Sequence, residues 1–245
     1  MKKLSVLIFG ILLPLLFTAA STNNMPAVSG PVLVYGGASA AAGTVKNAAI
    51  GAIGSGLTLN KPPPAQAVKV SRQITGTAKF IPVATGDFSD VNNCGPTACL
   101  NLLKYWHDLR GKQTLDSGNV KATYKKICTL TKFTSKLGMG NTYGYTGLQA
   151  FADKYCGASG EDYIDKAPLS WIKRNIDHNN MVILIIKASN YDPAVGGYHF
   201  VNCVGYYQPL KSNDVYLQII DGWDHSTAHY YNAKYGNISA FYLRW

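Results

Sequence analysis

The sequence predicts an α+β domain in which helices come first and an antiparallel β-sheet follows. Apolar residues recur with helical spacing in the first half of the domain, whereas the second half holds continuous or alternating apolar runs typical of strands. Helices followed by strands, instead of regular alternation, indicate a segregated fold with an antiparallel sheet. The globular region, of about 170 residues, is long enough to bury one core.

The N-terminus has the pattern of a secretory signal peptide over residues 1–20. Lys2 and Lys3 precede an uncharged apolar run over residues 4–17, and small residues follow at 18–21. The run is short for a membrane span, so we expect cleavage and a product that is secreted or associated with the cell surface, with no stable membrane span. An uncleaved anchor or a lipoprotein-like tether is the alternative, although no cysteine directly follows the small residues.

Residues 21–75 form a Gly/Ala/Pro-rich segment unlike the rest of the chain. Small residues dominate positions 36–43 and 48–56, and the prolines at 62–64 favour an extended linker. Large side chains are too few to build a core, so we expect a linker or a pro-segment. The sharper alternatives are a pro-segment that masks the active site until it is cleaved, or a membrane-active segment. The globular domain is expected over residues 76–245.

That domain is organised around a cysteine at the start of a helix. Residues 92–98 read Asn-Asn-Cys-Gly-Pro-Thr-Ala, and Pro96 suits the first helical turn, where a missing N–H costs nothing. The apolar positions that follow have helical spacing: Cys99, Leu102, Leu103 and Trp106. Cys94 is therefore expected at the positive end of a helix dipole, which favours the thiolate and predicts a nucleophile.

Further helices are expected before the strands begin. One is predicted over residues 121–132, a second is capped by Thr146, and a third is opened by Pro168. Residues 138–147 are rich in glycine and tyrosine and are expected to form a loop that either wraps a core edge or lines a substrate cleft. Residues 80–83 suggest a short lead-in segment or an edge strand.

Four strands are expected in the second half. Residues 181–186 are a continuous aliphatic run, typical of a strand covered on both faces. The other three are predicted over residues 198–207, 215–220 and 240–245. Together they are expected to form the antiparallel sheet.

The second half also supplies a base and a group to orient it. His199 begins one strand, directly after two glycines, and Asp221 ends the next; antiparallel pairing would place them side by side. An imidazole held in one tautomer can accept the proton of a thiol. Asp224 is the second choice as the orienting residue, and Trp223 could shield the pair from water.

The other four histidines are weaker candidates for the base. His107 lies about 20 Å along the helix from Cys94 at 1.5 Å per residue, so it cannot reach the thiol within that helix. His178 ends a helix among polar residues. His225 and His229 lie in a tyrosine-rich loop and remain alternatives.

These motifs resemble the papain-like cysteine peptidase superfamily, and within it the C39-like branch of bacterial bacteriocin-leader-processing peptidases and their free-standing relatives. That branch carries an Asn-x-Cys-Gly-Pro-x-x helix start, a Gly-x-His-x-Val strand and an aspartate that ends the next strand. Residues 92–98, 197–201 and 220–222 match these motifs in order. The resemblance covers residues 76–245 and implies a papain-like fold, with a nucleophile helix packed on an antiparallel sheet. It also implies that Cys94 is the nucleophile, His199 the general base and then acid, and Asp221 the orienting residue.

One departure from this family concerns the oxyanion. The family usually places a glutamine a few residues before the cysteine, and residues 86–93 contain none. The main-chain N–H of Cys94 can supply one donor, and Asn92 or Asn93 could supply a side-chain amide.

Five cysteines leave an odd thiol in a chain that is expected to be secreted. If Cys94 is that thiol, the remaining four could form two disulfides, one or none. Cys99 and Cys203 suit the core, whereas Cys128 and Cys156 suit a surface pair. No Cys-x-x-Cys and no zinc-like His/Cys spacing is present, so neither a metal nor a cofactor is expected.

The expected function is that of a secreted bacterial cysteine peptidase, which hydrolyses peptide bonds through a thioester acyl-enzyme. Its partner would be a peptide or protein substrate, with cell-wall peptide as one candidate. The formal net charge is +10 but forms no dense basic stripe, so nucleic acid is not an expected partner. Three alternatives remain: a catalytically degenerate papain-like binding or adhesion domain, an acyl transferase or cell-wall amidase with the same triad, and a membrane-active peptide over residues 21–60 fused to a processing domain.

Overall fold

The computed structural model describes residues 34–35, 68–158 and 160–245. The predicted signal peptide, and residues 21–33 and 36–67 of the predicted pro-segment or linker, lie outside the described residues. Within the described part, no helix is both long enough and apolar enough to span a membrane.

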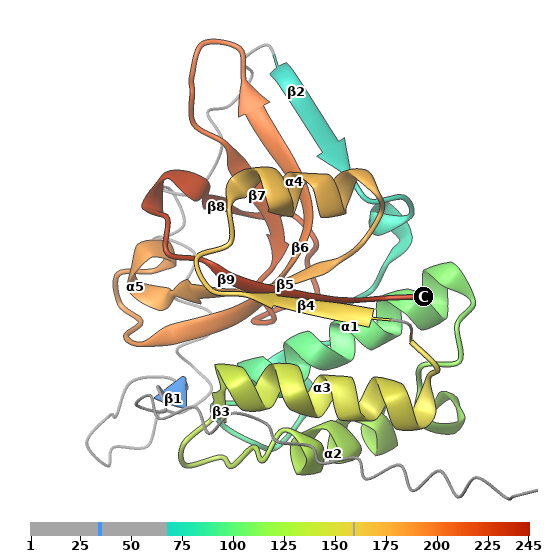
Figure 1. The fold of residues 1–245 in the computed structure, drawn as a ribbon. Coiled ribbons are helices and arrows are strands. Elements are labelled where there is room, and N and C mark those ends of the chain that lie inside the picture. Colours follow the sequence, from blue (N-terminus) through green and yellow to red (C-terminus); the bar gives the residue numbers. More distant parts are fainter. Residues whose placement is uncertain (1–33, 36–67, 159) are drawn as a thin grey trace, which may run out of the picture. The chain divides into compact units, whose positions relative to one another are not determined.

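A seven-stranded antiparallel sheet forms the centre of the fold (Figure 1). Its order is β4-β9-β5-β6-β7-β8, and β2 pairs with β6 beyond the end of β5. The strands are β2 (Val68–Gln73), β4 (Gly160–Ile164), β5 (Val182–Lys187), β6 (Tyr198–Pro209), β7 (Tyr216–Ile220), β8 (His229–Asn232) and β9 (Ser239–Arg244). A two-residue strand, β1 (Val34–Tyr35), pairs with another, β3 (Met139–Gly140).

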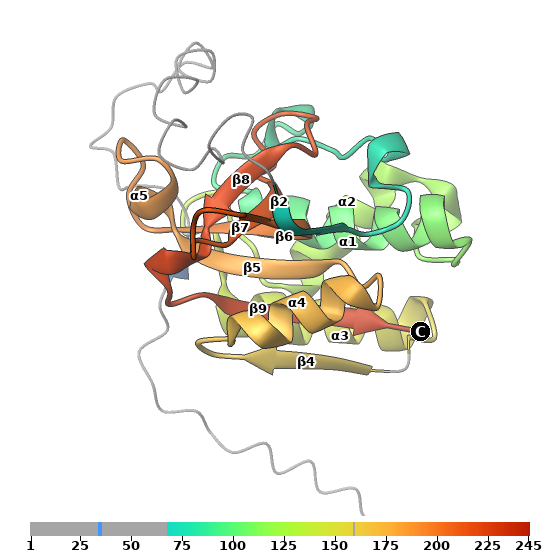
Figure 2. The same cartoon turned by 90° about the horizontal axis from the view of Figure 1, so that it is seen from above.

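The helices cover both faces of this sheet. On one side lie α1 (Cys94–Arg110), α2 (Val120–Leu130) and α3 (Asn141–Tyr155). On the other side lies α4 (Leu169–Asp177), as the view from above also shows (Figure 2). A single helical turn, α5 (Ala188–Tyr191), follows β5, and short 3-10 turns include Thr77–Lys79 and Thr85–Asp87.

This arrangement confirms the predicted α+β class, with the nucleophile helix packed on an antiparallel sheet. The aliphatic run at residues 181–186 is buried throughout, as expected for a strand covered on both faces. The strands predicted at 198–207, 215–220 and 240–245 correspond to β6, β7 and β9. Residues 80–83, in contrast, form no strand; the Asn101 side chain of α1 bonds both the N–H and the C=O of Val83 instead, at 2.8 and 3.0 Å.

The predicted loop over residues 138–147 is wrong for most of its length. Helix α3 already begins at Asn141, so Thr146 lies inside the helix and donates its hydroxyl to the carbonyl of Thr142. Two glycines in this stretch are packing positions. A Cβ on Gly144 would lie 2.6 Å from Met139 Cε, and one on Gly147 would lie 2.6 Å from the Leu130 carbonyl oxygen. Glycine therefore lets α3 approach its neighbours closely instead of forming a loop.

The folded region begins before the predicted boundary at residue 76. Strand β2 lies in the segment interpreted as pro-segment or linker, yet it pairs with β6 from Val68↔Pro209 to Gln73↔Gly205. Its residues Val68 to Gln73 read Val-Lys-Val-Ser-Arg-Gln, which lacks the long apolar run that marks a central strand. The weak pattern explains why the strand was not expected.

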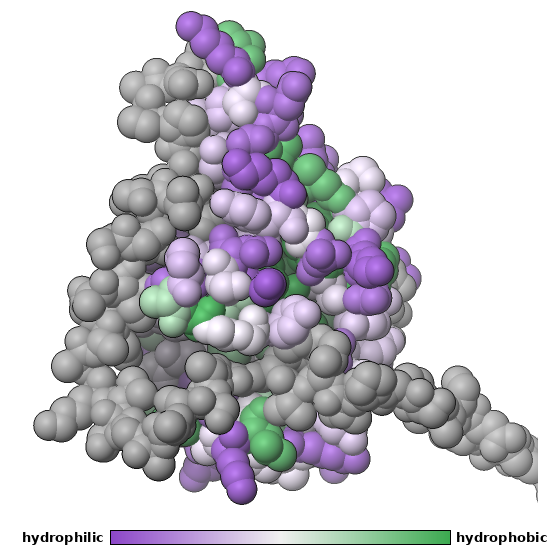
Figure 3. All heavy atoms as spheres, turned by 90° about the vertical axis from the view of Figure 1, so that its left-hand side faces the viewer, coloured by the Kyte–Doolittle hydropathy of each residue, from purple (hydrophilic) through white to green (hydrophobic). Residues whose placement is uncertain are grey.

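The face seen in Figure 3 carries hydrophilic side chains over much of its described surface, with smaller hydrophobic areas between them. Large apolar side chains among the described residues are nevertheless exposed at a few positions. Two of them, Val91 and Leu137, are 63% and 54% exposed. They lie on neighbouring loops, because the Asn92 amide donates to the Ser135 carbonyl at 2.9 Å.

Candidate active site

Cys94 is the first residue of α1, where the sequence predicts it. The helix begins because Pro96 fits its first turn and the Thr97 N–H bonds the carbonyl of Asn93 at 3.0 Å. Gly95 allows close packing beside the thiol, since a Cβ there would lie 2.4 Å from Met139 Cε and 2.9 Å from Met139 Cβ. The thiol therefore sits on a rigid support at the positive end of a 17-residue helix.

His199 meets Cys94 from the sheet side. It is the second residue of β6, pairs with Ile186 of β5, and is 4% exposed. The His199 ring and the Cys94 thiol are close enough for each to shift the pKa of the other by hydrogen bonding and charge. The structure thus brings together two residues that are 105 positions apart in the chain.

The pKa of Cys94 is lowered from its ordinary value. Burial opposes this and is the largest single influence, but the hydrogen bond and charge of His199 outweigh it together with the main-chain N–H groups of Phe200 and Gly95. The pKa of His199 is correspondingly raised: burial lowers it, while the Cys94 thiolate, the Asp221 charge and the Asp221 carbonyl raise it. Both directions favour a thiolate–imidazolium pair.

Asp221 lies beside His199, and the strand pairing explains why. β6 and β7 are antiparallel neighbours, with Asn202↔Ile220 in register, so the start of β6 lies near the end of β7. The contact itself differs from the predicted one. His199 Nε2 bonds the main-chain carbonyl oxygen of Asp221 at 2.7 Å, whereas the carboxylate turns elsewhere.

Asp221 is 1% exposed, and its carboxylate contacts three other groups. Oδ1 accepts from the Trp223 N–H at 2.9 Å, and Oδ2 accepts from the Tyr191 hydroxyl at 2.9 Å. His229 Nε2 lies 3.5 Å from Oδ2. Buried next to this carboxylate, the Tyr191 hydroxyl has a raised pKa and stays protonated as a donor.

Trp223 covers the His199 ring, as the sequence suggested. The two ring centroids are 4.7 Å apart and the planes are 24° from parallel. The centroid of the Tyr191 ring lies 5.4 Å from that of the Trp223 ring. This aromatic stack limits the access of water to the imidazole and fixes its plane.

The two asparagines before Cys94 join neighbouring loops. Asn93 is 3% exposed, donates its amide to the Thr85 carbonyl at 3.0 Å, and also contacts the Tyr124 hydroxyl. Asn92, with a φ of 56°, donates to the Ser135 carbonyl at 2.9 Å. Each amide therefore gives one of its two N–H groups to a main-chain carbonyl, and these bonds hold both side chains against neighbouring loops.

The loop after β7 carries the weaker candidates for base and orienting group. Asp224 is exposed and pairs with His229 at 3.0 Å, and not with His199. His225 reaches across to Asp87 at 3.0 Å, which ties this loop to the turn that precedes α1. His107 pairs with the adjacent Asp108, and His178 bonds the Arg174 carbonyl.

Among the described residues, one group of three side chains has the spacing of metal ligands: Asp221, Asp224 and His229. One possible ligand atom from each lies within 4.8 Å of the other two. The His229 ring lies between the two carboxylates at hydrogen-bond or near hydrogen-bond distance. These contacts join the three side chains directly to one another, so we assign them to a hydrogen-bonded network.

All five cysteines are unpaired. The surface pair considered for Cys128 and Cys156 is therefore wrong, and so is any disulfide among the other cysteines. Burial raises the pKa of Cys128 to about 11 and that of Cys156 and Cys203 to about 12, and it also raises the pKa of Cys99. Cys94 is the one thiol whose pKa moves toward the reactive form.

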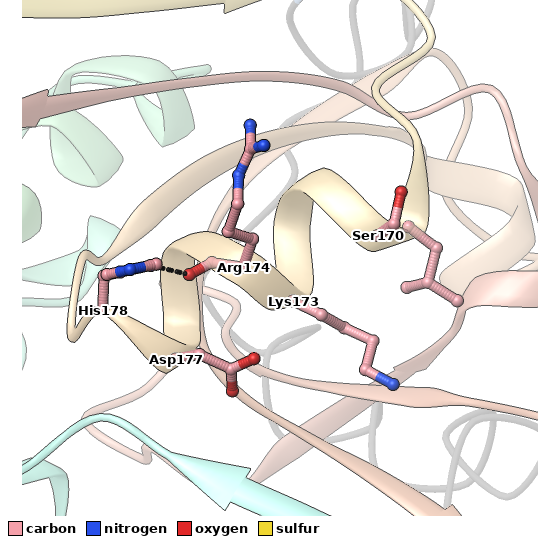
Figure 4. A pocket seen from close by; sticks show the side chains of 6 residues that line it. Ser170, Lys173, Arg174, Asp177 and His178 are labelled. Carbon is pink, nitrogen blue, oxygen red and sulfur yellow. Dashed lines mark hydrogen bonds between the residues drawn. The ribbon is translucent and has the colours of Figure 1, made fainter.

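A separate hollow of about 480 Å³ runs along α4 and has no convergent chemistry. Its polar lining includes Lys173, Arg174, Asp177 and His178 (Figure 4). The Lys173 and Arg174 side chains extend in different directions, and the His178 ring turns back to the Arg174 carbonyl. A smaller hollow of about 350 Å³ lies between α2 and the 133–135 loop, with Asp90 in its lining.

Sequence reasoning missed three parts of the site: the Tyr191 hydroxyl, the Asp87–His225 pair and the carbonyl contact to His199. Tyr191 lies in a one-turn helix that carries no periodic signal. Asp87 and His225 are 138 positions apart, and no spacing rule joins them. A main-chain contact leaves no trace in residue types.

Comparison with known proteins identifies a family and finds solved structures that resemble this chain. The profile described as the peptidase C39-like family matches residues 65–245, which is more than half of the chain. A crystal structure of a presumed C39-like peptidase from Bacillus anthracis is 13% identical, covers 71% of this chain and 98% of its own, and has a TM-score of 0.45. A search of curated proteins found no match.

Proposed function

Since the chain belongs to the peptidase C39-like family, it has a peptidase-type function, and we propose that it is a secreted cysteine peptidase with Cys94 as its nucleophile. The observation that carries this proposal is the Cys94 thiol at the start of α1 facing the buried ring of His199. The same contact favours the thiolate, which is the form that attacks a carbonyl carbon.

The proposed reaction has two steps. The Cys94 thiolate attacks the scissile carbonyl, and the resulting oxyanion is held by the main-chain N–H of Cys94 at the helix start. The imidazolium of His199 gives its proton to the leaving nitrogen as the C–N bond breaks, which leaves a thioester. His199 then takes a proton from water, which attacks the thioester and releases the carboxylate product and the free thiol.

One observation favours a second candidate, a degenerate binding domain. Asn92 and Asn93, the side chains considered as oxyanion donors, both have main-chain partners. If these bonds hold both amides away from the oxyanion, the site lacks one donor, and such a loss costs about 10²–10³ in rate where it has been measured. A domain with this fold that binds peptides without cleaving them would show the same contacts, so the test below separates the two functions.

Selective alkylation of the full chain tests the proposed nucleophile. At pH 7 iodoacetamide is expected to modify Cys94 first, because its lowered pKa leaves more thiolate at neutral pH than an ordinary cysteine has. Labelling of Cys94 should continue at pH values below those at which an ordinary thiol ionises. In contrast, Cys128, Cys156 and Cys203 should react only toward pH 11–12. Peptide mapping by mass spectrometry gives each rate, and hydrolysis of a peptide library is followed in parallel.

The peptidase and the binding domain predict different results in this alkylation and hydrolysis experiment. Loss of hydrolysis in step with Cys94 modification supports the peptidase. A Cys94 that labels like an ordinary thiol, together with no hydrolysis, contradicts it and favours the binding domain. A labelled amine added to the same assay distinguishes acyl transfer, because transfer incorporates the label into product.

A further inference from the structure

The hydrogen bond between His199 and Asp221 is made by the main chain of Asp221 and not by its side chain. His199 Nε2 lies 2.7 Å from the Asp221 carbonyl oxygen, and this bond is buried. The carboxylate of the same residue instead accepts from the Trp223 N–H and the Tyr191 hydroxyl, each at 2.9 Å. Two different parts of Asp221 therefore have two different sets of partners.

We propose that the main-chain carbonyl of Asp221, and not its carboxylate, orients His199, and that Tyr191 is a positioning residue that holds the carboxylate away from the ring. This inference rests on the proposed function, because it assigns a role within that site. It changes the expected consequence of replacing Asp221, since no side-chain substitution removes a main-chain carbonyl.

The chemistry of the carbonyl fixes the tautomer of His199. A carbonyl oxygen only accepts hydrogen bonds, so Nε2 must carry a hydrogen. The remaining ring nitrogen, Nδ1, is then the atom that exchanges a proton with the Cys94 thiol. A main-chain acceptor thus does what a side-chain orienting group does in other triads, and it does so at every pH.

The carboxylate has a separate, indirect part to play. Its charge raises the pKa of His199, and its bond to the Trp223 N–H shapes the turn that aims the carbonyl at the ring. Tyr191 adds the second bond to the carboxylate, and its ring packs against Trp223, which in turn covers His199. The charged groups that act on the imidazole are thus Cys94 from α1 and Asp221 from the end of β7.

The test compares three substitutions in the full chain. Asp221→Asn removes the charge but keeps the carbonyl and an oxygen for the Trp223 N–H. Tyr191→Phe removes one bond to the carboxylate and keeps the charge. Asp165→Asn removes a charge at an exposed residue whose side chain accepts from the Ser239 hydroxyl, keeps an oxygen for that bond, and serves as the control.

Asp221→Asn is expected to lower kcat/KM by only about 10–100-fold, against the roughly 10⁴-fold loss seen when an amide replaces a carboxylate bonded directly to a catalytic histidine. The alkaline limb of its pH profile should move to lower pH, because the imidazolium loses a stabilising charge. Tyr191→Phe should lower kcat/KM without moving that limb, and Asp165→Asn should change neither. A loss of 10³-fold or more in Asp221→Asn overturns the proposal.

Nitrogen NMR of the His199 ring gives a readout that needs no substrate. In Asp221→Asn, Nε2 is expected to stay protonated in the neutral ring, and a switch to the Nδ1–H tautomer overturns the proposal. If Asp221→Asn does not fold, Asp221→Ser keeps the carbonyl and a hydroxyl oxygen for the Trp223 N–H, and the same results are expected of it. Because the tautomer and the pH profile of Cys94 alkylation are independent of turnover, absence of peptidase activity would not be mistaken for failure of this inference.

Discussion

Replacing Cys94 with alanine is expected to reduce peptide hydrolysis by at least about 10⁴-fold, to the background rate, because no other group can form the thioester. The thiol is small and contributes little to the core, so the variant should fold. Its thermal unfolding midpoint, measured by circular dichroism, is expected to stay within a few degrees of the parent. The rate at which the variant hydrolyses the peptide library is compared with the rate of the parent protein.

A matched cysteine variant controls for the loss of a thiol as such. Cys128 lies half-buried on α2, and burial raises its pKa to about 11, so Cys128→Ala should keep most of the activity. Hydrolysis that survives in Cys94→Ala at a comparable rate would rule out the proposed mechanism. Equal loss in both variants would instead indicate damage to the fold.

Gly147→Ala is expected to destabilise the domain by about 3 kcal/mol, although alanine is the better helix former by about 1 kcal/mol. The new Cβ would lie 2.6 Å from the Leu130 carbonyl oxygen and 2.7 Å from Thr131 Cα. These are backbone atoms at the end of α2, so a side-chain rotation cannot relieve the contact. The midpoint of thermal unfolding should fall by roughly 6–12 °C.

Gly86→Ala is the control for this substitution. A Cβ at Gly86 has no neighbouring atom within 4 Å, so the change is expected to alter the free energy of unfolding by no more than about 0.5 kcal/mol. Similar losses in both variants would show that the close approach of α2 and α3 is not the cause. A stable Gly147→Ala would mean that the two helices can separate without cost.

The sequence predicted those parts of the fold that are fixed by long, strongly patterned segments. β5 could be predicted because a continuous aliphatic run is typical of a strand buried on both faces. α1 could be predicted because Pro96 and the spacing of the apolar residues both indicate a helix that starts near Cys94. β2 and β8 were not predicted, since they are short, contain several polar residues and owe their place to pairing with β6 and β7. The start of α3 was misread because its glycines look like loop residues until the neighbouring backbone is known.

The candidate site divides in the same way. Cys94, His199 and Asp221 could be proposed from residue type and strand order, and the fold brings them together. The partners of Asn92 and Asn93 could not be foreseen, because Thr85 and Ser135 accept through main-chain carbonyls. Tertiary hydrogen bonds of this kind depend on where loops meet and not on which residues they contain.

The unequal reactivity of the five thiols has a consequence for oxidative damage. Oxidants such as peroxides attack thiolates, and the pKa shifts confine the thiolate form at neutral pH to Cys94. The fold does not depend on a disulfide, since all five cysteines are free. An oxidant should therefore inactivate Cys94 and leave the packed core intact. A sulfenic acid at Cys94 can still be reduced by an added thiol, whereas further oxidation is permanent, so the enzyme would lose its chemistry well before its structure.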